Sequence, residues 1–143
     1  MAFHDIKFNK LVPELEVSDI QRSRDFYVNI LGFKIEFERP ENKFLYLSLE
    51  GSQLMIEQNR NPLWVTGKLE YPFGRGINLQ IMLKNISPVL ARLKKNKHPL
   101  KLKAHTRWFR KGNILLGTRL FLVLDPDGYL LRFSQDLGKK RRP

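Results

Sequence analysis

The sequence predicts an α+β protein made of two β-α-β-β-β repeats, whose curled mixed sheets surround a cavity. Two observations predict this class. Short segments of alternating apolar and polar residues occur throughout, and helical spacing of apolar residues occurs once in each half of the 143-residue chain. A hydrophobic share of 42% is enough for the core of one domain of this length. We divide the chain into repeat one at 11–57, a connection at 58–75, repeat two at 76–135 and a basic tail at 136–143.

The first repeat begins with a strand over residues 11–17, where apolar and polar residues alternate from Leu15 to Val17. Asp19 is suited to cap a helix, and the apolar spacing after it predicts a helix over about 19–31. Gly32 is expected to end this helix in the left-handed conformation. Three further strands are expected, at 33–38, 44–49 and 54–57.

The second repeat follows a long connection that is poor in apolar residues, and long connections are often functional. A strand over 77–83 leads into a helix that ends near Asn96. Asp125-Pro-Asp-Gly128 predicts a tight turn before the last strand, because proline sets φ and glycine accepts a positive φ. The other strands of this half are expected at 99–103, 106–110, 120–124 and 129–134.

Composition excludes several classes of function. The chain has no cysteine, so disulfides, thiolate metal sites and thiol nucleophiles are excluded. The longest apolar run, Leu120 to Leu124, is far shorter than the ~18 residues of a membrane span. No signal-type segment opens the chain, so we expect a cytoplasmic protein without a membrane partner. No dinucleotide or phosphate loop is present, and we expect no cofactor.

Charge is divided unevenly along the chain. The formal net charge is +12, with −1 in residues 1–83 and +13 in residues 84–143. Such asymmetry favours contact with a polyanion, although basic surfaces are also common simply because they are well solvated. The tail Lys139–Arg142 contains no aromatic residue to stack on a base, and the basic half shows no nucleic-acid module. Nucleic acid is therefore an alternative partner and not the expected one.

Residues 16–33 carry a recognisable set of landmarks: Asp19, the Phe26-Tyr27 pair and Leu31-Gly-Phe33. Together with Gly76–Ile81 and Asp125–Phe133, they resemble the vicinal oxygen chelate superfamily. This superfamily includes glyoxalase I, fosfomycin-resistance enzymes, extradiol dioxygenases and bleomycin-resistance proteins. The resemblance covers most of residues 11–135 and is specific for the fold more than for the activity.

The resemblance also implies where metal ligands would lie in the enzymes of this group. The matching positions here are Val12, Glu57, Asn78 and Arg132, of which only Glu57 is an anionic donor. The three histidines, His4, His98 and His105, lie elsewhere without ligand spacing. We therefore expect no metal. The resemblance then implies the bleomycin-resistance branch, whose members sequester a drug as two-fold homodimers with an exchanged N-terminal strand.

Strand alternation extends the candidate site. If Val12 faces the cavity, so do the glutamates that follow at alternate positions, and the same rule applies to the strand of Asn78. The predicted lining is Glu14, Glu16, Glu57, Asn78, Gln80 and Arg132. The alternative is that Glu14 and Glu16 face solvent while Leu15 and Val17 form the core.

Two tryptophans complete the candidate site. Trp108 and Trp64 offer flat rings for stacking on an aromatic or cationic ligand, or else they pack at a dimer seam or in the core. No catalytic arrangement is visible, and we assign no catalytic residue. The sequence thus favours a metal-free protein that binds a bulky, partly aromatic ligand of the bleomycin type. The alternatives are a lyase, isomerase or dioxygenase-like enzyme that uses Glu57 and Arg132, and a module that contacts nucleic acid.

Overall fold

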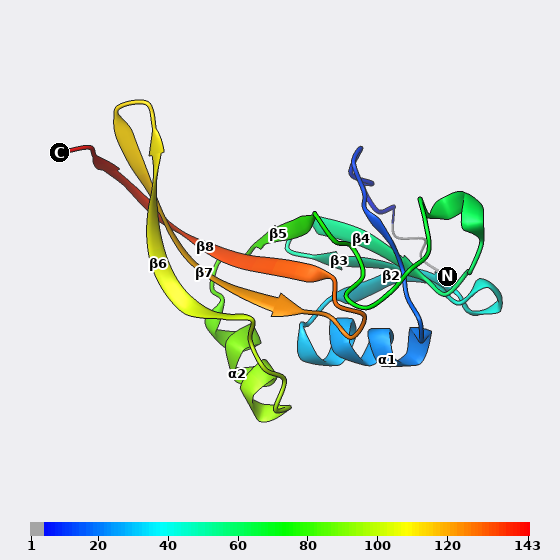
Figure 1. Ribbon diagram of the computed structural model, residues 1–143. Coiled ribbons are helices and arrows are strands. Elements are labelled where there is room, and N and C mark those ends of the chain that lie inside the picture. Colours follow the sequence, from blue (N-terminus) through cyan, green and yellow to red (C-terminus); the bar gives the residue numbers. More distant parts are fainter. Residues whose placement is uncertain (1–4) are drawn as a thin grey trace. The chain divides into compact units, whose positions relative to one another are not determined.

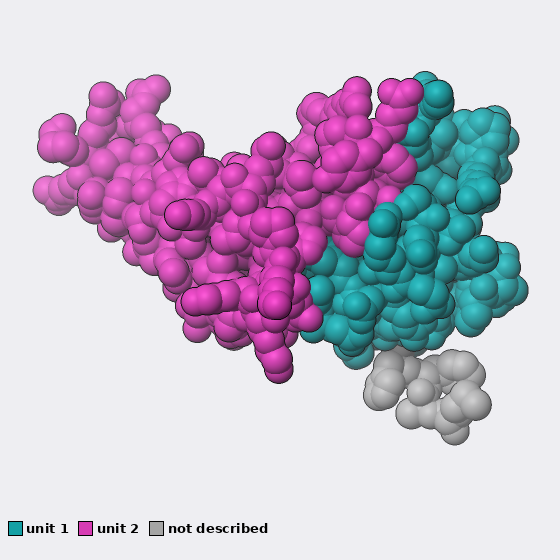
Figure 2. All heavy atoms as spheres, turned by 60° about the horizontal axis from the view of Figure 1, so that its bottom comes forward, with its two compact units in different colours: residues 1–69 teal, residues 70–143 magenta. Residues whose placement is uncertain are grey.

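A computed structural model describes residues 5–143 and divides the chain into two compact units. One unit extends to Leu69 and the other runs from Glu70 to Pro143 (Figure 2). Each unit contains one four-stranded mixed sheet and a helical segment, so the predicted α+β class is confirmed. No helix in this part of the chain is long and apolar enough to cross a membrane.

The first unit contains the elements expected for repeat one. Its helical and strand elements are β1 (Glu14–Glu16), α1 (Ile20–Arg24), the π-helical η1 (Asp25–Ile30), β2 (Lys34–Arg39), the 3-10 turn η2 (Pro40–Asn42), β3 (Phe44–Leu49), β4 (Ser52–Glu57) and the 3-10 turn η3 (Pro62–Trp64). The strand order is β1-β4-β3-β2, with β1 and β4 parallel and the other pairs antiparallel. Gly32 has φ 91°, which confirms its left-handed conformation after the helix.

The second unit has the same topology. It consists of β5 (Asn78–Met82), α2 (Ser87–Lys95), β6 (Leu102–Lys111), β7 (Ile114–Leu124) and β8 (Leu130–Arg141). The strand order is β5-β8-β7-β6, again with the first pair parallel and the rest antiparallel. The same order of pairing in both sheets confirms the internal repeat (Figure 1).

Several strand boundaries in the second half were predicted wrongly. The expected strands at 99–103 and 106–110 are one strand, β6, which begins only at Leu102. The expected strands at 120–124 and 129–134 are the ends of much longer strands, since β7 begins at Ile114 and β8 continues to Arg141. Most of the basic segment after residue 135 is therefore strand. It pairs with the start of β7, so it is held by backbone hydrogen bonds despite having few apolar residues.

One face of each sheet forms a hydrophobic core with its helix. In the first unit, Leu47 and Ile56 of the sheet and Tyr27 and Leu31 of the helical segment are fully buried. In the second unit, Phe121 and Phe133 stack with ring centroids 5.3 Å apart, and α2 buries Val89 and Leu93. The opposite face of each sheet carries the polar and aromatic side chains considered below.

A β-bulge interrupts the pairing of β7 with β8. Gly117 lies opposite Gly138 and Thr118 lies opposite Asp136, so Leu137 has no partner across the ladder. An extra residue of this kind inverts the alternation of side chains along the strand beyond it. On β8, Arg132 and Ser134 therefore share a face with Lys139 and Arg141.

Candidate functional site

The glutamates of the first unit lie together on the face opposite the core. Glu14 pairs with Met55 and Glu16 with Glu57 across the parallel strands β1 and β4. Leu15 is buried on the core side, which places Glu14 and Glu16 on the other face. Burial raises the pKa of Glu57, and a hydrogen bond with Glu14 and the charge of Glu14 raise it further, against the opposing effect of Arg39. Glu57 is therefore protonated more readily than an ordinary carboxyl group, which relieves its repulsion by Glu14.

The carboxylate of Glu16 is hydrogen-bonded to the backbone of the chain. Its Oε1 atom accepts hydrogen bonds from the backbone N–H groups of Asn59 and Arg60, at 3.0 and 2.7 Å. This carboxylate thus fixes the loop that follows β4. The loop lines an open pocket of about 470 Å³ whose walls are polar: Glu41, Asn42, Lys43, Glu57, Gln58, Asn59 and Arg60.

Aromatic rings cover the neighbouring strands on the same face. Tyr46 pairs with Met55 and stacks on Phe37, with ring centroids 5.0 Å apart and an interplanar angle of 14°. The guanidinium of Arg39 lies 3.9 Å from the centre of the Phe44 ring, so this face already holds one planar cation. Phe8 completes the group, with its ring 5.3 Å from that of Tyr46 and nearly perpendicular to it.

Sequence reasoning missed most of this aromatic group. Phe37, Phe44 and Tyr46 were not among the residues of the predicted lining. Tyr46 is buried on the face of Glu57. Alternation along β3 could have revealed it, since Phe44 and Tyr46 are an even number of residues apart and Phe44 pairs with Glu57. No local pattern in the sequence predicts the position of Phe8. Its segment is held by hydrogen bonds between the distant Gln53 side chain and the backbone of residues 7 and 9.

In the second unit, the predicted residues Asn78, Gln80 and Arg132 share one face of the sheet. Asn78 and Gln80 alternate along β5, and Gln80 pairs directly with Arg132 of β8. Ser134 follows on the same face of β8. Leu120 of β7 pairs with Ser134 on one side and with His105 of β6 on the other, so His105 lies on this face too.

Three polar atoms on this face are buried without hydrogen-bond partners: Arg132 Nε, Ser134 Oγ and His105 Nε2. His105 Nδ1 lies 2.9 Å from the carbonyl oxygen of Lys103, an acceptor, so Nδ1 carries the proton. In the neutral ring, Nε2 is then an acceptor. The face therefore offers unsatisfied donors on Arg132 and Ser134 and an unsatisfied acceptor on His105. Neither Ser134 nor His105 was expected as a site residue.

Neither tryptophan shares the face of Arg132 in the second sheet. Trp108 pairs with Gly117, and the alternation of β6 places it on the face opposite His105 and Arg132. Its ring is covered on one side by the Lys140 ammonium, 3.9 Å from the ring centre. Trp64 lies in η3 and is 67% exposed. The structure thus groups Glu14, Glu16 and Glu57 in one unit and Asn78, Gln80 and Arg132 in the other, with Trp108 on the opposite face of the second sheet from Arg132.

The chain is similar to known proteins in both sequence and fold. The model of the Glyoxalase/Bleomycin resistance protein/Dioxygenase superfamily matches residues 9–133, so the chain belongs to that superfamily. The lactoylglutathione lyase of Escherichia coli O157:H7 is 29% identical over 129 residues, 85% of this chain and 88% of that protein.

Solved structures include a superfamily member from Vibrio splendidus 12B01 that is 34% identical, with coverage of 88% and 97% and a TM-score of 0.41. TioX from Micromonospora sp. ML1 is 19% identical, with coverage of 91% and 100% and a TM-score of 0.70. The likeness to TioX shows a shared fold. Closer kinship with bleomycin-resistance proteins stays a prediction.

The residues at the superfamily's implied ligand positions do not suit a divalent metal ion. Arg132 keeps its positive charge and has no lone pair to donate, and the side chain of Val12 has no donor atom. Asn78 offers a neutral amide, which leaves Glu57 as the one anionic donor. Across residues 5–143, no group of three or more His, Cys, Asp or Glu side chains is placed to hold a metal ion. His4 lies outside the described residues.

Proposed function

We propose that the protein is a metal-independent binding protein that sequesters a bulky, partly aromatic small molecule of the bleomycin type. The observation that carries this proposal is the set of three buried polar atoms without partners on one face of the second sheet. Each such atom costs about 1–3 kcal/mol when it lacks a hydrogen bond. A ligand that accepts from Arg132 and Ser134 and donates to His105 recovers this cost, so the face is suited to a polar organic guest.

The first sheet offers complementary chemistry for the same class of ligand. Phe37 is partly exposed and stacks on the buried Tyr46, so the Phe37 ring suits a flat heteroaromatic group. Arg39 covers the Phe44 ring, and Glu57 adds a carboxyl group that suits positive charge. A drug that carries both aromatic rings and positive charge matches these groups.

Calorimetric titration with metal-free bleomycin tests the proposal. We expect saturable binding, and we expect Arg132→Gln to weaken it about tenfold or more, because a hydrogen bond to a charged group contributes about 1.5–3 kcal/mol. Arg119→Gln is the matched control, since Arg119 lies on the neighbouring strand β7 and on the opposite face. Absence of heat with the unmodified protein would exclude bleomycin as the ligand. Equal weakening by the two substitutions would exclude the Arg132 face as the site.

A second function is supported by the 29% identity to lactoylglutathione lyase and by the raised pKa of Glu57. A carboxyl group with a raised pKa is suited to general acid–base catalysis near neutral pH. Turnover of lactoylglutathione, followed with and without added Zn²⁺ or Ni²⁺, distinguishes the two functions. Turnover that Glu57→Gln abolishes would establish the enzyme. Lack of turnover under all of these conditions, together with saturable binding of bleomycin, would establish the binding protein.

A further inference from the structure

The three long strands of the second unit continue together beyond the part of the sheet that β5 covers. β5 pairs only with Leu130–Ser134 of β8, whereas the later residues of β8 pair with the first residues of β7, and these pair with the end of β6. We call this extension the terminal ribbon and define it as residues 106–117 and 138–142. Figure 1 shows these strands twisting around one another away from α2.

The terminal ribbon is strongly and uniformly basic. It contains seven Lys or Arg residues and no Asp or Glu: Arg107, Arg110, Lys111, Lys139, Lys140, Arg141 and Arg142. All seven are exposed, and within residues 5–143 none of them forms an ion pair. The next acidic residue along β8, Asp136, accepts a hydrogen bond from the backbone of Gly138.

The rest of the second unit does little to offset this charge. Residues 71–124 contain no Asp or Glu. Asp125 and Asp127 are 2% and 3% exposed, so neither presents a carboxylate at the surface. A high density of unneutralised positive charge generates a field that attracts polyanions and raises their association rate.

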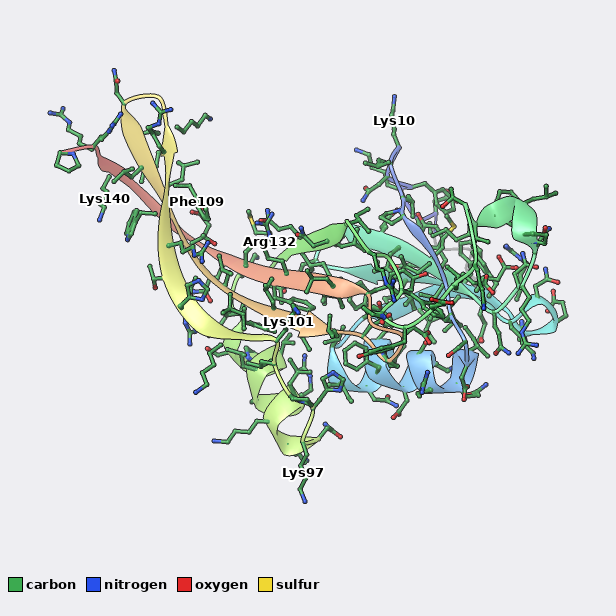
Figure 3. The ribbon with its side chains drawn as sticks, viewed as in Figure 1. Lys10, Lys97, Lys101, Phe109, Arg132 and Lys140 are labelled. Carbon is green, nitrogen blue, oxygen red and sulfur yellow. The ribbon has the colours of Figure 1, made fainter. Side chains whose placement is uncertain are left out.

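Aromatic rings lie among the basic side chains on both faces of the terminal ribbon. Phe109 is 43% exposed and shares a face with Arg107, Lys111, Lys139 and Arg141. Figure 3 shows Phe109 and Lys140 near the end of the ribbon. A partly exposed ring among four cations presents a surface for stacking.

The opposite face has a second ring. Trp108 is 38% exposed and lies between Gly117 and the Lys140 ammonium. A Cβ atom at Gly117 would lie 2.6 Å from the Trp108 ring, so glycine at this position allows the ring to lie flat on the strand. Residues 139–142 include no aromatic residue, but the pairing of the strands brings Trp108 of β6 next to Lys140.

From this combination we infer that the terminal ribbon binds single-stranded nucleic acid. Lys and Arg contact the phosphates, and bases stack on Phe109, as in other sequence-tolerant single-strand sites, while Trp108 lies beside the same strands under Lys140. Exposed rings favour a single strand over a duplex, whose bases are already stacked. Two rings among seven charges make a poor membrane anchor. The face of the ribbon that carries Phe109 continues from the face that carries His105 and Arg132, and Lys139 lies seven residues beyond Arg132 on β8, about 20 Å along the strand.

Anisotropy titration of a fluorescent dT20 oligonucleotide with the full chain tests the inference. We expect binding whose logarithmic dependence on salt has a slope of about −0.7 for each phosphate neutralised. Lys139→Gln with Arg141→Gln should reduce this slope by about 1.4. Lys94→Gln with Lys95→Gln removes the same charge from the exposed face of α2 and should leave the slope nearly unchanged.

Two further readouts separate stacking from charge. Phe109→Ala should weaken dT20 binding about fivefold or more, the loss expected for one stacked base. In a Trp64→Phe background, dT20 should quench the emission of Trp108, which is then the only tryptophan. Circular dichroism of each variant checks that the fold is retained.

Several results would overturn the inference. Equal effects of the ribbon and α2 charge variants, or binding without Trp108 quenching and without an effect of Phe109→Ala, would show attraction to charge alone. Tighter binding of a 20-base-pair duplex than of dT20 would assign the ribbon to duplex. Binding to phosphatidylserine vesicles that dT20 does not displace would assign it to a membrane surface.

Discussion

Glu57 and Glu14 show how two neighbouring carboxyl groups set the pH response of the first unit. Burial and Glu14 raise the pKa of Glu57, so the folded chain holds a proton there more tightly than the unfolded chain does. This contribution to stability is complete below the unfolded pKa and is lost as pH rises through the folded pKa.

Glu57→Gln is therefore expected to increase thermal stability near pH 7, where the native carboxylate is repelled by Glu14, and to have little effect near pH 4. The introduced amide retains an N–H donor toward Glu14. Melting temperatures at the two pH values measure this difference. A variant that is less stable at pH 7 would contradict the raised pKa of Glu57.

Gly117 is required by the ring that lies over it. Gly117→Ala is expected to lower the free energy of unfolding by about 1–3 kcal/mol, because the new methyl group would displace the Trp108 ring. Urea denaturation measures the loss, and the emission of Trp108 should shift as its ring moves. Gly67→Ala serves as the control, since an added Cβ there meets no atom within 4 Å.

Sequence reasoning located single residues well where alternation applied and poorly where it did not. Alternation along the strands predicted one lining of six residues, Glu14, Glu16, Glu57, Asn78, Gln80 and Arg132. The strand register places the glutamates on one face of the first sheet and the other three on one face of the second. His105 was missed because its link to Ser134 passes through β7, and pairing between distant strands leaves no local pattern. Trp108 was grouped with Arg132 on residue type alone, which carries no information about which face a ring occupies.

The helical segment of the first unit depends on its first turn. Asp19 Oδ1 accepts hydrogen bonds from the backbone N–H groups of Gln21 and Arg22, at 3.0 and 3.2 Å. Asp19→Ala is expected to destabilise the protein by about 1 kcal/mol, the usual cost of losing such a cap. Urea denaturation should show a lower midpoint with an unchanged slope. Glu41→Ala, at an exposed acidic position in η2, controls for the change of charge.

Elements were predictable wherever apolar periodicity or a strong turn marked them. The helix after Asp19, the left-handed Gly32 and the turn that ends at Gly128 all lie where the sequence predicts them. The start of β7 and the end of β8 were missed because neither segment alternates apolar and polar residues. Exposed strands need no apolar alternation, and runs such as Lys139–Arg142 have the composition of a solvated tail.

At the scale of the whole molecule, the two units share one topology while differing greatly in charge. The repeat could be predicted because each half shows the same order of periodic segments. The placement of one sheet relative to the other, and hence the enclosed cavity, stays a prediction, since no local pattern in the sequence specifies it.

The superfamily resemblance predicts a homodimer. Light scattering coupled to size-exclusion chromatography should give twice the chain mass of 16.9 kDa. If the basic second units adjoin in the dimer, added salt should favour dimerisation, because screening weakens their repulsion. A mass of one chain at all concentrations and salt levels would exclude the dimer.

The bulge at Leu137 determines which way the last basic side chains point. Deleting Leu137 would restore an uninterrupted two-residue repeat along β8. Lys139 and Arg141 would then rotate toward the side of Trp108, and Lys140 would turn away from that ring. A single extra residue thus inverts the alternation of side chains along β8. Because of it, Arg132 and Arg141 point to the same side of the sheet, although they are an odd number of positions apart.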